Sequence, residues 1–381
     1  MNQRKSLLLV LLLSIVLISG VVLALGRTNH PEPLQNPVQS EPVQSPARQH
    51  EPVQNQAQTQ QDPVLVGRVL HVEGQLLRYV PEEQQWVAVL PDTPWGKDET
   101  LYSAEKTRAE MVLPNNTRVR IGPSTEIRLV DLTSGRTEVD LIAGTARLLN
   151  KSSEVEIKVA TAFGYAVITA GTILEVCADG TSAELIALQG NANFVHSQTG
   201  SHFEVMTGSN SLLVDEQQVG VGTGRIDTAW RQWNKTRDNL WAKRLEVKGD
   251  SVKYVHPSIR DESYVLDRYG SWSRVYYDGA YRYFWRPAHV AVGWAPFTVG
   301  SWMYWYGDWC WVPSEPFGYV THHYGNWVLV SGCWYWAPPV AVTVGIGGPL
   351  LDIRFGWYPG RVAWVHSGAH IGWLPLAPGE I

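Results

Sequence analysis

Apolar and polar residues alternate with a period of two over residues 64–213. Short turn sequences such as Asn115-Asn116 and Asp179-Gly180 interrupt the alternation. Successive side chains of a β-strand point to opposite faces, so this pattern is typical of half-buried strands. Asn and Gly also tolerate the positive φ that tight turns require. We therefore predict an all-β domain over residues 64–225.

A helical spacing replaces this alternation in residues 226–245, which read "IDTAWRQWNKTRDNLWAKRL". Four apolar residues and one arginine fall near one side of a helix: Trp230, Trp233, Leu240, Trp241 and Arg244. We predict one linking helix within residues 226–250, packed on a β domain by its tryptophans. No other helix is expected after the N-terminal segment.

Residues 251–381 repeat a pattern of glycine and tryptophan, in which each position recurs 25 residues later. The first copy contains Gly293, Trp294, Gly300, Trp302, Gly307, Trp309, Trp311 and Pro313, and the second contains Gly318, Tyr319, Gly325, Trp327, Gly332, Trp334, Trp336 and Pro338. A looser copy precedes both, over residues 269–287. Each copy predicts a β-hairpin with a tight turn at a glycine, and so short a unit buries its apolar face only against other copies. We predict a Trp-rich β-hairpin repeat domain.

The repeat places tryptophans on one face of neighbouring strands. Trp309 and Trp311 share a face, as do Trp334 and Trp336, because side chains alternate along a strand. We expect this indole row to be the core of the domain. The alternative is an exposed strip that stacks on sugar rings of peptidoglycan or a surface polysaccharide.

A ligand surface would need polar groups beside aromatic rings. The candidates for such a surface are Tyr304, Asp308, Glu315, His322, His323 and Tyr335, with Arg286 as a further polar group. Cys310 lies beside Trp309 and Cys333 beside Trp334, so both should point away from the indole row towards a common opposite face. We predict a disulfide between them in an oxidising compartment, which leaves Cys177 as a free thiol.

The N-terminal segment, residues 1–26, determines the compartment. Residues 7–25 are apolar apart from two serines and one glycine, and Arg4 and Lys5 precede them. A helix of about twenty apolar residues spans the hydrocarbon core of a bilayer. We predict an uncleaved transmembrane helix over residues 6–25, single-pass in the inner membrane, with the C-terminal bulk in the periplasm. The alternative is a cleaved signal segment and a periplasmic protein, because small residues near Gly26 fit a cleavage site.

Residues 27–63 are rich in Pro and Gln, and "EPVQ" occurs there twice. The segment has no aromatic residues that could form a core, so we predict a disordered tether that holds the folded part away from the membrane.

The composition and the charge exclude one class of partner. The net charge is −5, with 31 Lys and Arg against 36 Asp and Glu. Nucleic-acid binding needs a basic surplus to neutralise phosphates, so we expect no nucleic-acid partner.

The usual signatures of enzymes are also missing from the sequence. It contains no Gly-x-Ser-x-Gly, His-Glu-x-x-His, phosphate-loop or Cys-x-x-Cys motif. On a strand, His322 and His323 would point to opposite faces, which does not suit a metal site. A glycosidase needs two carboxylates on either side of the sugar bond. Nothing in the sequence distinguishes Asp308 with Glu315, or Asp267 with Asp278, from other surface acids. We expect no catalytic residue, no metal and no cofactor.

The middle segment resembles the FecR-type extracytoplasmic domain. The residues that carry the resemblance keep the family's order: 67–69, 72–74, 107–113, 117–121, 139–144, 170–176 and 185–190. The sequence departs from the family pattern at Asn115-Asn116, Thr161-Ala162 and Ile173. The resemblance implies a sensory module. The best-known members of the family control a sigma factor through a cytoplasmic helical domain, and the five residues Met1 to Lys5 are too few to form one.

The C-terminal segment resembles a Trp-rich family of unassigned function that follows FecR-like domains in bacterial envelope proteins. The resemblance rests on "LDRYGSW", "WRPAHVAVGWAPFTVGSW", "WCWVPSEPFGYVTHHYGNWV" and "IGWLPLAPGE". It implies no catalytic residue. We therefore expect a mainly β, membrane-tethered envelope protein that acts by binding or scaffolding. The alternatives are glycan binding or processing through the Trp-rich module, and signal relay to a membrane partner; its partners would be peptidoglycan, a polysaccharide or an envelope protein.

Overall fold

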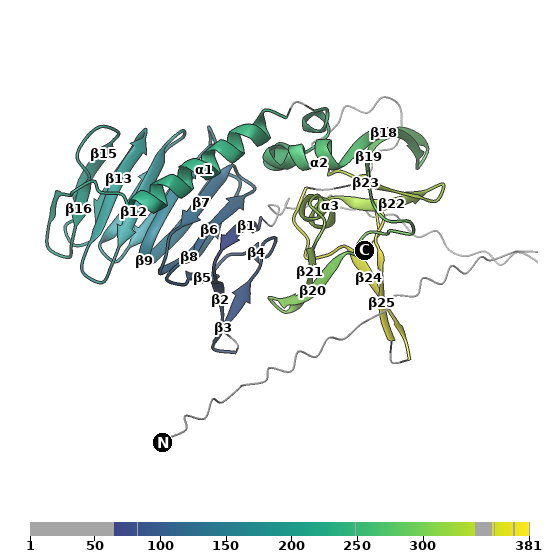
Figure 1. The fold of residues 1–381 in the computed structure, drawn as a ribbon, viewed down its shortest axis with the longest axis horizontal. Coiled ribbons are helices and arrows are strands. Elements are labelled where there is room, and N and C mark those ends of the chain that lie inside the picture. Colours follow the sequence, from purple (N-terminus) through teal and green to yellow (C-terminus); the bar gives the residue numbers. More distant parts are fainter. Residues whose placement is uncertain are drawn as a thin grey trace, which may run out of the picture. The chain divides into compact units, whose positions relative to one another are not determined.

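The structure is a computed structural model that describes residues 65–380, apart from 82, 248, 340–352, 354 and 369 (Figure 1). The predicted membrane segment and the predicted tether lie outside the described residues. Among the residues described, no helix is long and apolar enough to cross a membrane. Residues 62–363 and 373–381 form one compact unit, and the contacts below lie within it.

The N-terminal part of this unit is built from two layers of mostly antiparallel strands, and β9 (Arg136–Asn150) belongs to both. In hydrogen-bonded order, the first layer is β4 (Pro94–Trp95), β1 (Gly67–Glu73), β6 (Arg108–Leu113), β7 (Thr117–Ile121), β9, β12 (Ile173–Ala178), β13 (Ala183–Gln189), β16 (Leu212–Val214) and β17 (Val219–Val221). The second layer is β3 (Gln85–Val89), β2 (Leu76–Val80), β5 (Thr100–Ser103), β8 (Thr125–Leu132), β9, β10 (Glu156–Thr161), β11 (Gly164–Ile168), β14 (Asn191–His196) and β15 (His202–Met206). The prediction of an all-β domain here is confirmed.

Strand β9 changes layers at Gly144. Its first half pairs with β8 and β10, and its second half, from Gly144 onward, pairs with β12. Gly144 has φ +95°, and a Cβ there would lie 2.5 Å from Cα of Thr125. Only glycine fits a positive φ with so close a backbone neighbour, so the corner between the layers depends on this residue.

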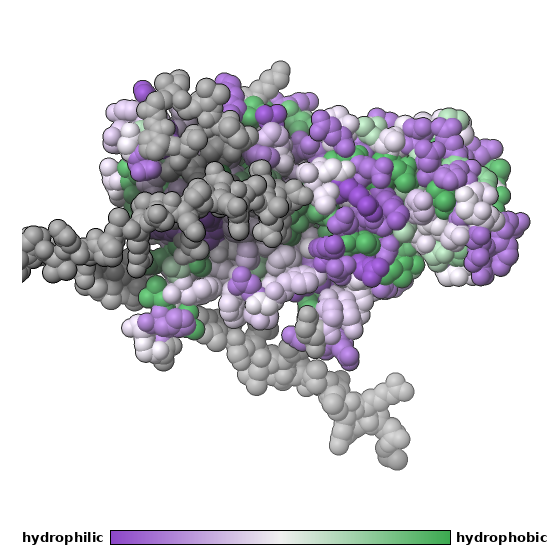
Figure 2. Space-filling model, turned by 180° about the vertical axis from the view of Figure 1, so that it is seen from behind, coloured by the Kyte–Doolittle hydropathy of each residue, from purple (hydrophilic) through white to green (hydrophobic). Residues whose placement is uncertain are grey.

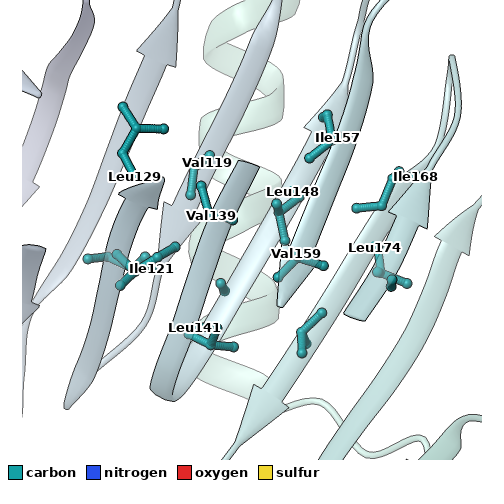
Figure 3. Packing of buried hydrophobic residues seen from close by; sticks show 14 of the residues in the cluster. Val119, Ile121, Leu129, Val139, Leu141, Leu148, Ile157, Val159, Ile168 and Leu174 are labelled. Atoms are coloured by element: carbon teal, nitrogen blue, oxygen red, sulfur yellow. The ribbon is translucent and has the colours of Figure 1, made fainter. Parts of the chain in front are cut away.

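The core of the domain lies between the two layers (Figure 3). Side chains from six neighbouring strands meet there: Val119, Ile121, Leu129, Val139, Leu141, Leu148, Ile157, Val159, Ile168 and Leu174. In β11, buried and half-buried residues alternate strictly, as expected for strands with one face in the core.

Helix α1 (Thr228–Leu245) confirms the predicted linking helix. It begins at Asp227, whose carboxylate accepts a hydrogen bond from the backbone N–H of Trp230 at 2.8 Å. Trp230, Trp233 and Trp241 are buried, but Leu240 is exposed. Two polar residues, Asn234 and Arg237, are buried on the packed side of the helix instead.

The C-terminal part consists of three tryptophan hairpins and short helices. The hairpins are β18 (Gly270–Tyr277) with β19 (Ala280–Pro287), β20 (Gly300–Trp305) with β21 (Asp308–Pro313), and β22 (Asn326–Val330) with β23 (Cys333–Ala337). A further hairpin, β24 (Val362–Ser367) with β25 (His370–Pro375), forms its own sheet. The two 3-10 helices cover Ser251–Lys253 and Pro257–Glu262, and the short α-helices are α2 (Ser263–Tyr269) and α3 (Gly318–His323). The prediction of a single helix was therefore wrong, because α2 and α3 are too short to show a helical period.

Each tryptophan hairpin closes with the same kind of turn. The turn residues are Asp278-Gly279, Tyr306-Gly307 and Ser331-Gly332, and all six have positive φ. Two consecutive residues with positive φ form the type I′ turn, whose twist matches that of antiparallel strands. The repeat read from the sequence therefore corresponds to a repeated hairpin.

Candidate functional site

Each tryptophan hairpin contributes at least one fully buried indole to the core. The tryptophans of the second strands, Trp285, Trp311 and Trp336, are 0–2% exposed. They lie directly opposite Trp272, Trp302 and Trp327 of the first strands. A Cβ on Gly300 would lie 2.7 Å from the indole of Trp311 and 2.4 Å from the carbonyl oxygen of Val312, and Gly270 and Gly325 hold the same place in the other hairpins. The repeated glycines thus leave space for the buried indoles.

The aromatic residues nearer the hairpin tips are more exposed. Trp309 is 48% exposed and packs edge-on against Tyr304, directly opposite on β20, with ring centroids 5.7 Å apart. Trp334 is half-buried. The prediction that the whole indole row is core is confirmed for Trp311 and Trp336 and wrong for Trp309, because the tip of β20–β21 extends beyond the core.

The hairpin β18–β19 carries three exposed tyrosines, Tyr276, Tyr281 and Tyr283. Its inner face buries Val275 and Phe284. The other face carries the core pair Trp272–Trp285 at its base and, towards the turn, the cross-strand pairs Arg274–Tyr283 and Tyr276–Tyr281. Tyr281 is 62% exposed. A solvent-facing strand surface normally carries polar residues, so three exposed tyrosines here are not explained by folding.

The contacts of these side chains fall into two groups, one near the turn and one near the base of the hairpin. The rings of Tyr276 and Tyr281 are 5.2 Å apart, and the Arg274 guanidinium lies 4.3 Å from the centroid of the Tyr281 ring. Towards the base, Tyr254 stacks on Tyr283 at 5.1 Å. We call Tyr254, Arg274, Tyr276, Tyr281 and Tyr283 the tyrosine face.

The structure separates the residues of the predicted ligand surface. Tyr304 and Asp308 are exposed near the tip of β20–β21. Tyr335 is half-buried on β23, 6.0 Å from the guanidinium of Arg286. Glu315, His322 and His323 are buried, so their assignment to a ligand surface was wrong. The tyrosine face was missed, although tyrosines at alternate positions on both sides of Asp278-Gly279 were a visible signal.

The two histidines lie in helix α3, not on a strand, and have structural contacts. The Nδ1 atom of His322 lies 2.9 Å from the carbonyl oxygen of Gly318, and its Nε2 atom lies 3.1 Å from the backbone N–H of Phe297. Donation by Nδ1 and acceptance by Nε2 satisfy a neutral ring. Burial lowers the pKa of His322 to about 3 and that of His323 to about 4. Glu315 accepts a hydrogen bond from the indole of Trp294 at 3.0 Å, and burial raises its pKa.

All three cysteines are free thiols, so the predicted disulfide between Cys310 and Cys333 is not formed. The prediction assumed that the second and third hairpins are neighbours in one sheet. In the structure β20–β21 is a separate two-stranded sheet, whereas β23 pairs with β19 and β22. Cys310 is buried in the core and Cys333 is half-buried.

Buried polar contacts join the β domain to the tryptophan hairpins. Glu99 accepts hydrogen bonds from Arg78 at 2.9 Å and from the indole of Trp305 at 2.8 Å. Arg68 forms an ion pair with Glu262 at 2.9 Å, and its guanidinium lies 4.6 Å from the ring of Tyr319. These contacts make the two parts one continuous structure.

A second buried network fixes α1 to the β domain. The carboxylate of Glu110 accepts hydrogen bonds from Arg120 at 2.7 Å, from Arg237 at 2.9 Å and from the indole of Trp241 at 3.0 Å. Burial alone would raise the pKa of Glu110, but the two arginines more than offset this effect, and the pKa lies below its usual value.

Where described residues are visible in Figure 2, hydrophobic residues lie in small groups between hydrophilic ones. This mixture is ordinary for a soluble surface. The tyrosine face remains the candidate for binding a large ligand, because Tyr276, Tyr281 and Tyr283 are each at least half exposed.

Two family matches cover the parts just described. Residues 99–193 match the FecR protein family, and residues 263–380 match a family of unknown function, DUF6600. The chain contains a FecR domain followed by a DUF6600 domain. Both resemblances drawn from the sequence are confirmed. The tyrosine face, apart from Tyr254, lies in the DUF6600 domain.

Similarity to other proteins is distant. Two crystal structures described as a "putative anti-sigma factor" from Parabacteroides distasonis ATCC 8503 align with 35% of this chain at 16% identity and a TM-score of 0.30. The alignment covers 64% of the length of those chains. No curated protein matches this sequence.

Proposed function

We propose that this protein is a non-catalytic binding protein of the bacterial envelope, and that its ligand is an extended glycan held on the tyrosine face. One observation carries the proposal: three tyrosines are exposed towards the turn of hairpin β18–β19, beyond the buried Trp285 on the same face. Such exposure adds little to folding, so we infer that the rings serve a partner.

The chemistry of the face suits a sugar chain. The rings of tyrosine offer apolar faces to the C–H side of a pyranose, and their hydroxyls donate and accept hydrogen bonds at its edge. Tyr276, Tyr281 and Tyr283 follow the hairpin, so one chain could contact several rings in sequence. Arg274 adds donors for ring oxygens or acidic substituents.

The rest of the chain supports a place in the envelope. The apolar residues 6–25 would anchor the protein in the inner membrane, and residues 27–63 would give the folded part reach towards the cell wall. The FecR domain would serve as the base of the DUF6600 domain, since Glu99 and Arg68 join the two through buried contacts.

Sedimentation with insoluble glycan tests this function. Full-length protein in detergent is mixed with purified peptidoglycan sacculi or with an insoluble polysaccharide. We expect retention of the wild-type protein and a loss of about tenfold or more in apparent affinity for a Tyr281→Ala, Tyr283→Ala variant. Each sugar ring stacked on an aromatic side chain should contribute about 1 kcal/mol, and about 1.4 kcal/mol corresponds to a factor of ten.

The matched control is Tyr304→Ala, which removes a tyrosine of similar exposure from another hairpin. It should bind like the wild type, and all variants should keep the melting temperature within a few degrees. If the wild-type protein were not retained on any envelope polymer, the proposal that it binds a glycan would be refuted. If Tyr304→Ala lost as much affinity as the double variant, the assignment of binding to the tyrosine face would be refuted.

The FecR match favours a second candidate, relay of a signal to a membrane partner. In this case glycan binding on the DUF6600 domain should change the hydrogen exchange of FecR residues near Glu99. If hydrogen exchange near Glu99 did not change when the glycan was bound, the protein would bind the glycan without relaying a signal.

A further inference from the structure

The arginines on the strands of the two-layer β part pair with carboxylates. Arg120 lies 2.7 Å from Glu110, and Arg147 donates to Glu175 at 2.8 Å. The other arginines of these strands also form ion pairs, within 4.0 Å: Arg68, Arg78, Arg108, Arg118, Arg128 and Arg136. In this part of the chain the protein itself neutralises its strand arginines.

Four arginines of the DUF6600 domain contact tyrosine rings instead. The guanidinium of Arg274 lies 4.3 Å from the ring centroid of Tyr281, and that of Arg361 lies 4.4 Å from the ring centroid of Tyr358. The same contact, at up to 6.0 Å, is made by Arg268 and Arg286. None of these four arginines forms an ion pair with another described residue.

Arg274 is the one charged residue of the tyrosine face. Its side chain is exposed, and it lies directly opposite Tyr283 of β19. The hairpin β18–β19 contains three arginines and one aspartate, Asp278 at the turn, whereas the whole chain has a net charge of −5. The local charge is therefore positive at the place where the glycan would lie.

Stacking on Tyr281 leaves the N–H donors of Arg274 without an acceptor among the described residues. A cation–π contact uses the face of the guanidinium, while its N–H groups point outward in the guanidinium plane. A carboxylate matches this planar fork with two parallel hydrogen bonds, which a single hydroxyl does not. The ring contact also restricts the arginine side chain, so less freedom is lost when a ligand binds.

We propose that the glycan of the tyrosine face is acidic, and that Arg274 selects it by binding a carboxylate on one of its sugar units. A sugar ring packed against Tyr276 or Tyr283 would place such a carboxylate within reach of the guanidinium, because both tyrosines neighbour Arg274 on the hairpin. This inference rests on the proposed function and narrows it to one class of glycan.

Polygalacturonate and its fully methyl-esterified form are the probes, because they share one sugar chain and differ in charge. Both are immobilised by their reducing ends, and binding of the full-length protein is measured in a detergent without a sugar headgroup. We expect the wild type to bind the acidic polymer about tenfold more tightly at low salt. This preference should shrink as NaCl is raised from about 50 to about 500 mM, because salt screens exposed charges.

Arg274→Gln should lower the affinity for the acidic polymer by about fivefold or more, and leave the affinity for the methyl ester within about twofold. Arg274→Lys keeps the charge but not the planar fork, so it should fall between the two. Arg361→Gln is the matched control, because it removes another arginine stacked on a tyrosine, and it should bind like the wild type. Arg274 is exposed, so its variants should keep the melting temperature within a few degrees.

Several results would overturn the inference and leave the proposed function intact. They are equal affinity of the wild type for the two polymers, an unchanged preference for the acidic polymer in Arg274→Gln, and retention on sacculi without binding to either polymer. An equal loss on both polymers in Arg274→Gln would also overturn it, since Arg274 would then only position Tyr281. If the wild type bound neither polymer and was not retained on sacculi or insoluble polysaccharide, the proposed function would fail and the inference with it.

Discussion

Trp305 of the second tryptophan hairpin donates its indole N–H to Glu99 of the FecR domain at 2.8 Å. Both side chains are buried, and Arg78 donates to the same carboxylate oxygen. Burial raises the pKa of Glu99, which shows that its solvation is lost more than its partners replace it. The buried carboxylate of Glu99 therefore depends on its hydrogen bonds from Arg78 and Trp305, and losing either donor should destabilise the junction of the two domains.

The first prediction concerns this junction. Trp305→Phe removes the donor and leaves Glu99 with Arg78, and we expect the free energy of unfolding to fall by about 1–2 kcal/mol. Urea unfolding measures the change. Trp309→Phe on the same hairpin is the control and should cost little, since Trp309 is partly exposed. An equal loss in both variants would show that the bond to Glu99 is not the cause.

The second prediction compares two tryptophans of β21. Trp311 is 2% exposed and Trp309 is 48% exposed. Trp311→Ala should cost about 3–5 kcal/mol, because a large cavity opens in the core. Trp309→Ala should stay within about 1 kcal/mol of the wild type. Thermal unfolding of both variants tests this difference, and similar melting temperatures would contradict the assignment of Trp311 to the core.

Local patterns were enough to predict most of the fold. Alternation along β11 and helical spacing in α1 follow from neighbouring residues, and the offset of 25 residues located the second and third hairpins. The sharing of β9 between layers depends on Gly144 and on strands distant in sequence, so no local pattern indicated it. The burial of Arg237 likewise depends on Glu110, which is 127 residues away.

The candidate site was harder to predict for the same reason. Histidine is polar, so the sequence suggested that His322 and His323 lie on the surface. Both are buried in helix α3 by segments distant in sequence that pack against it. Tyrosine is common both in cores and on surfaces, so the sequence did not show whether Tyr281 is exposed. Its exposure became clear only from the structure, in which Phe284 is buried on the other face of the hairpin.

The third prediction is a pH dependence that originates at His322. Its pKa is about 3 in the folded protein, against 6.5 for an unperturbed histidine. The unfolded chain therefore binds a proton between these values while the folded chain does not. Stability is complete above about pH 6.5 and falls as the pH is lowered towards 3, by roughly 2 kcal/mol between pH 7 and pH 5 for one such histidine.

His322→Gln removes this titration and should flatten the dependence on pH. The slope of unfolding free energy against pH is the quantity to compare, because the substitution also changes stability at neutral pH. His323, with a pKa of about 4, retains its own contribution in the variant. An unchanged slope between pH 7 and pH 5 would contradict a neutral, buried His322.

The last prediction concerns the attachment of α1 to the FecR domain. Glu110 and Asp238 both face Arg120, at 2.7 Å each, but Glu110 is fully buried and Asp238 is about half exposed. Removal of the buried charge leaves Arg120 and Arg237 without their shared buried partner. We expect Glu110→Gln to cost about 3–5 kcal/mol of unfolding free energy, since breaking a buried pair leaves an uncompensated charge.

Asp238→Asn removes the same charge from the same arginine at the surface, where water replaces the lost partner. Its cost should stay below about 1 kcal/mol. Hydrogen exchange of the α1 amides locates the effect, because only Glu110→Gln should raise exchange in residues 228–245, where Arg237 and Trp241 both donate to Glu110. If the two variants lost stability equally, the charge of Arg120 and not the burial of Glu110 would hold the helix in place.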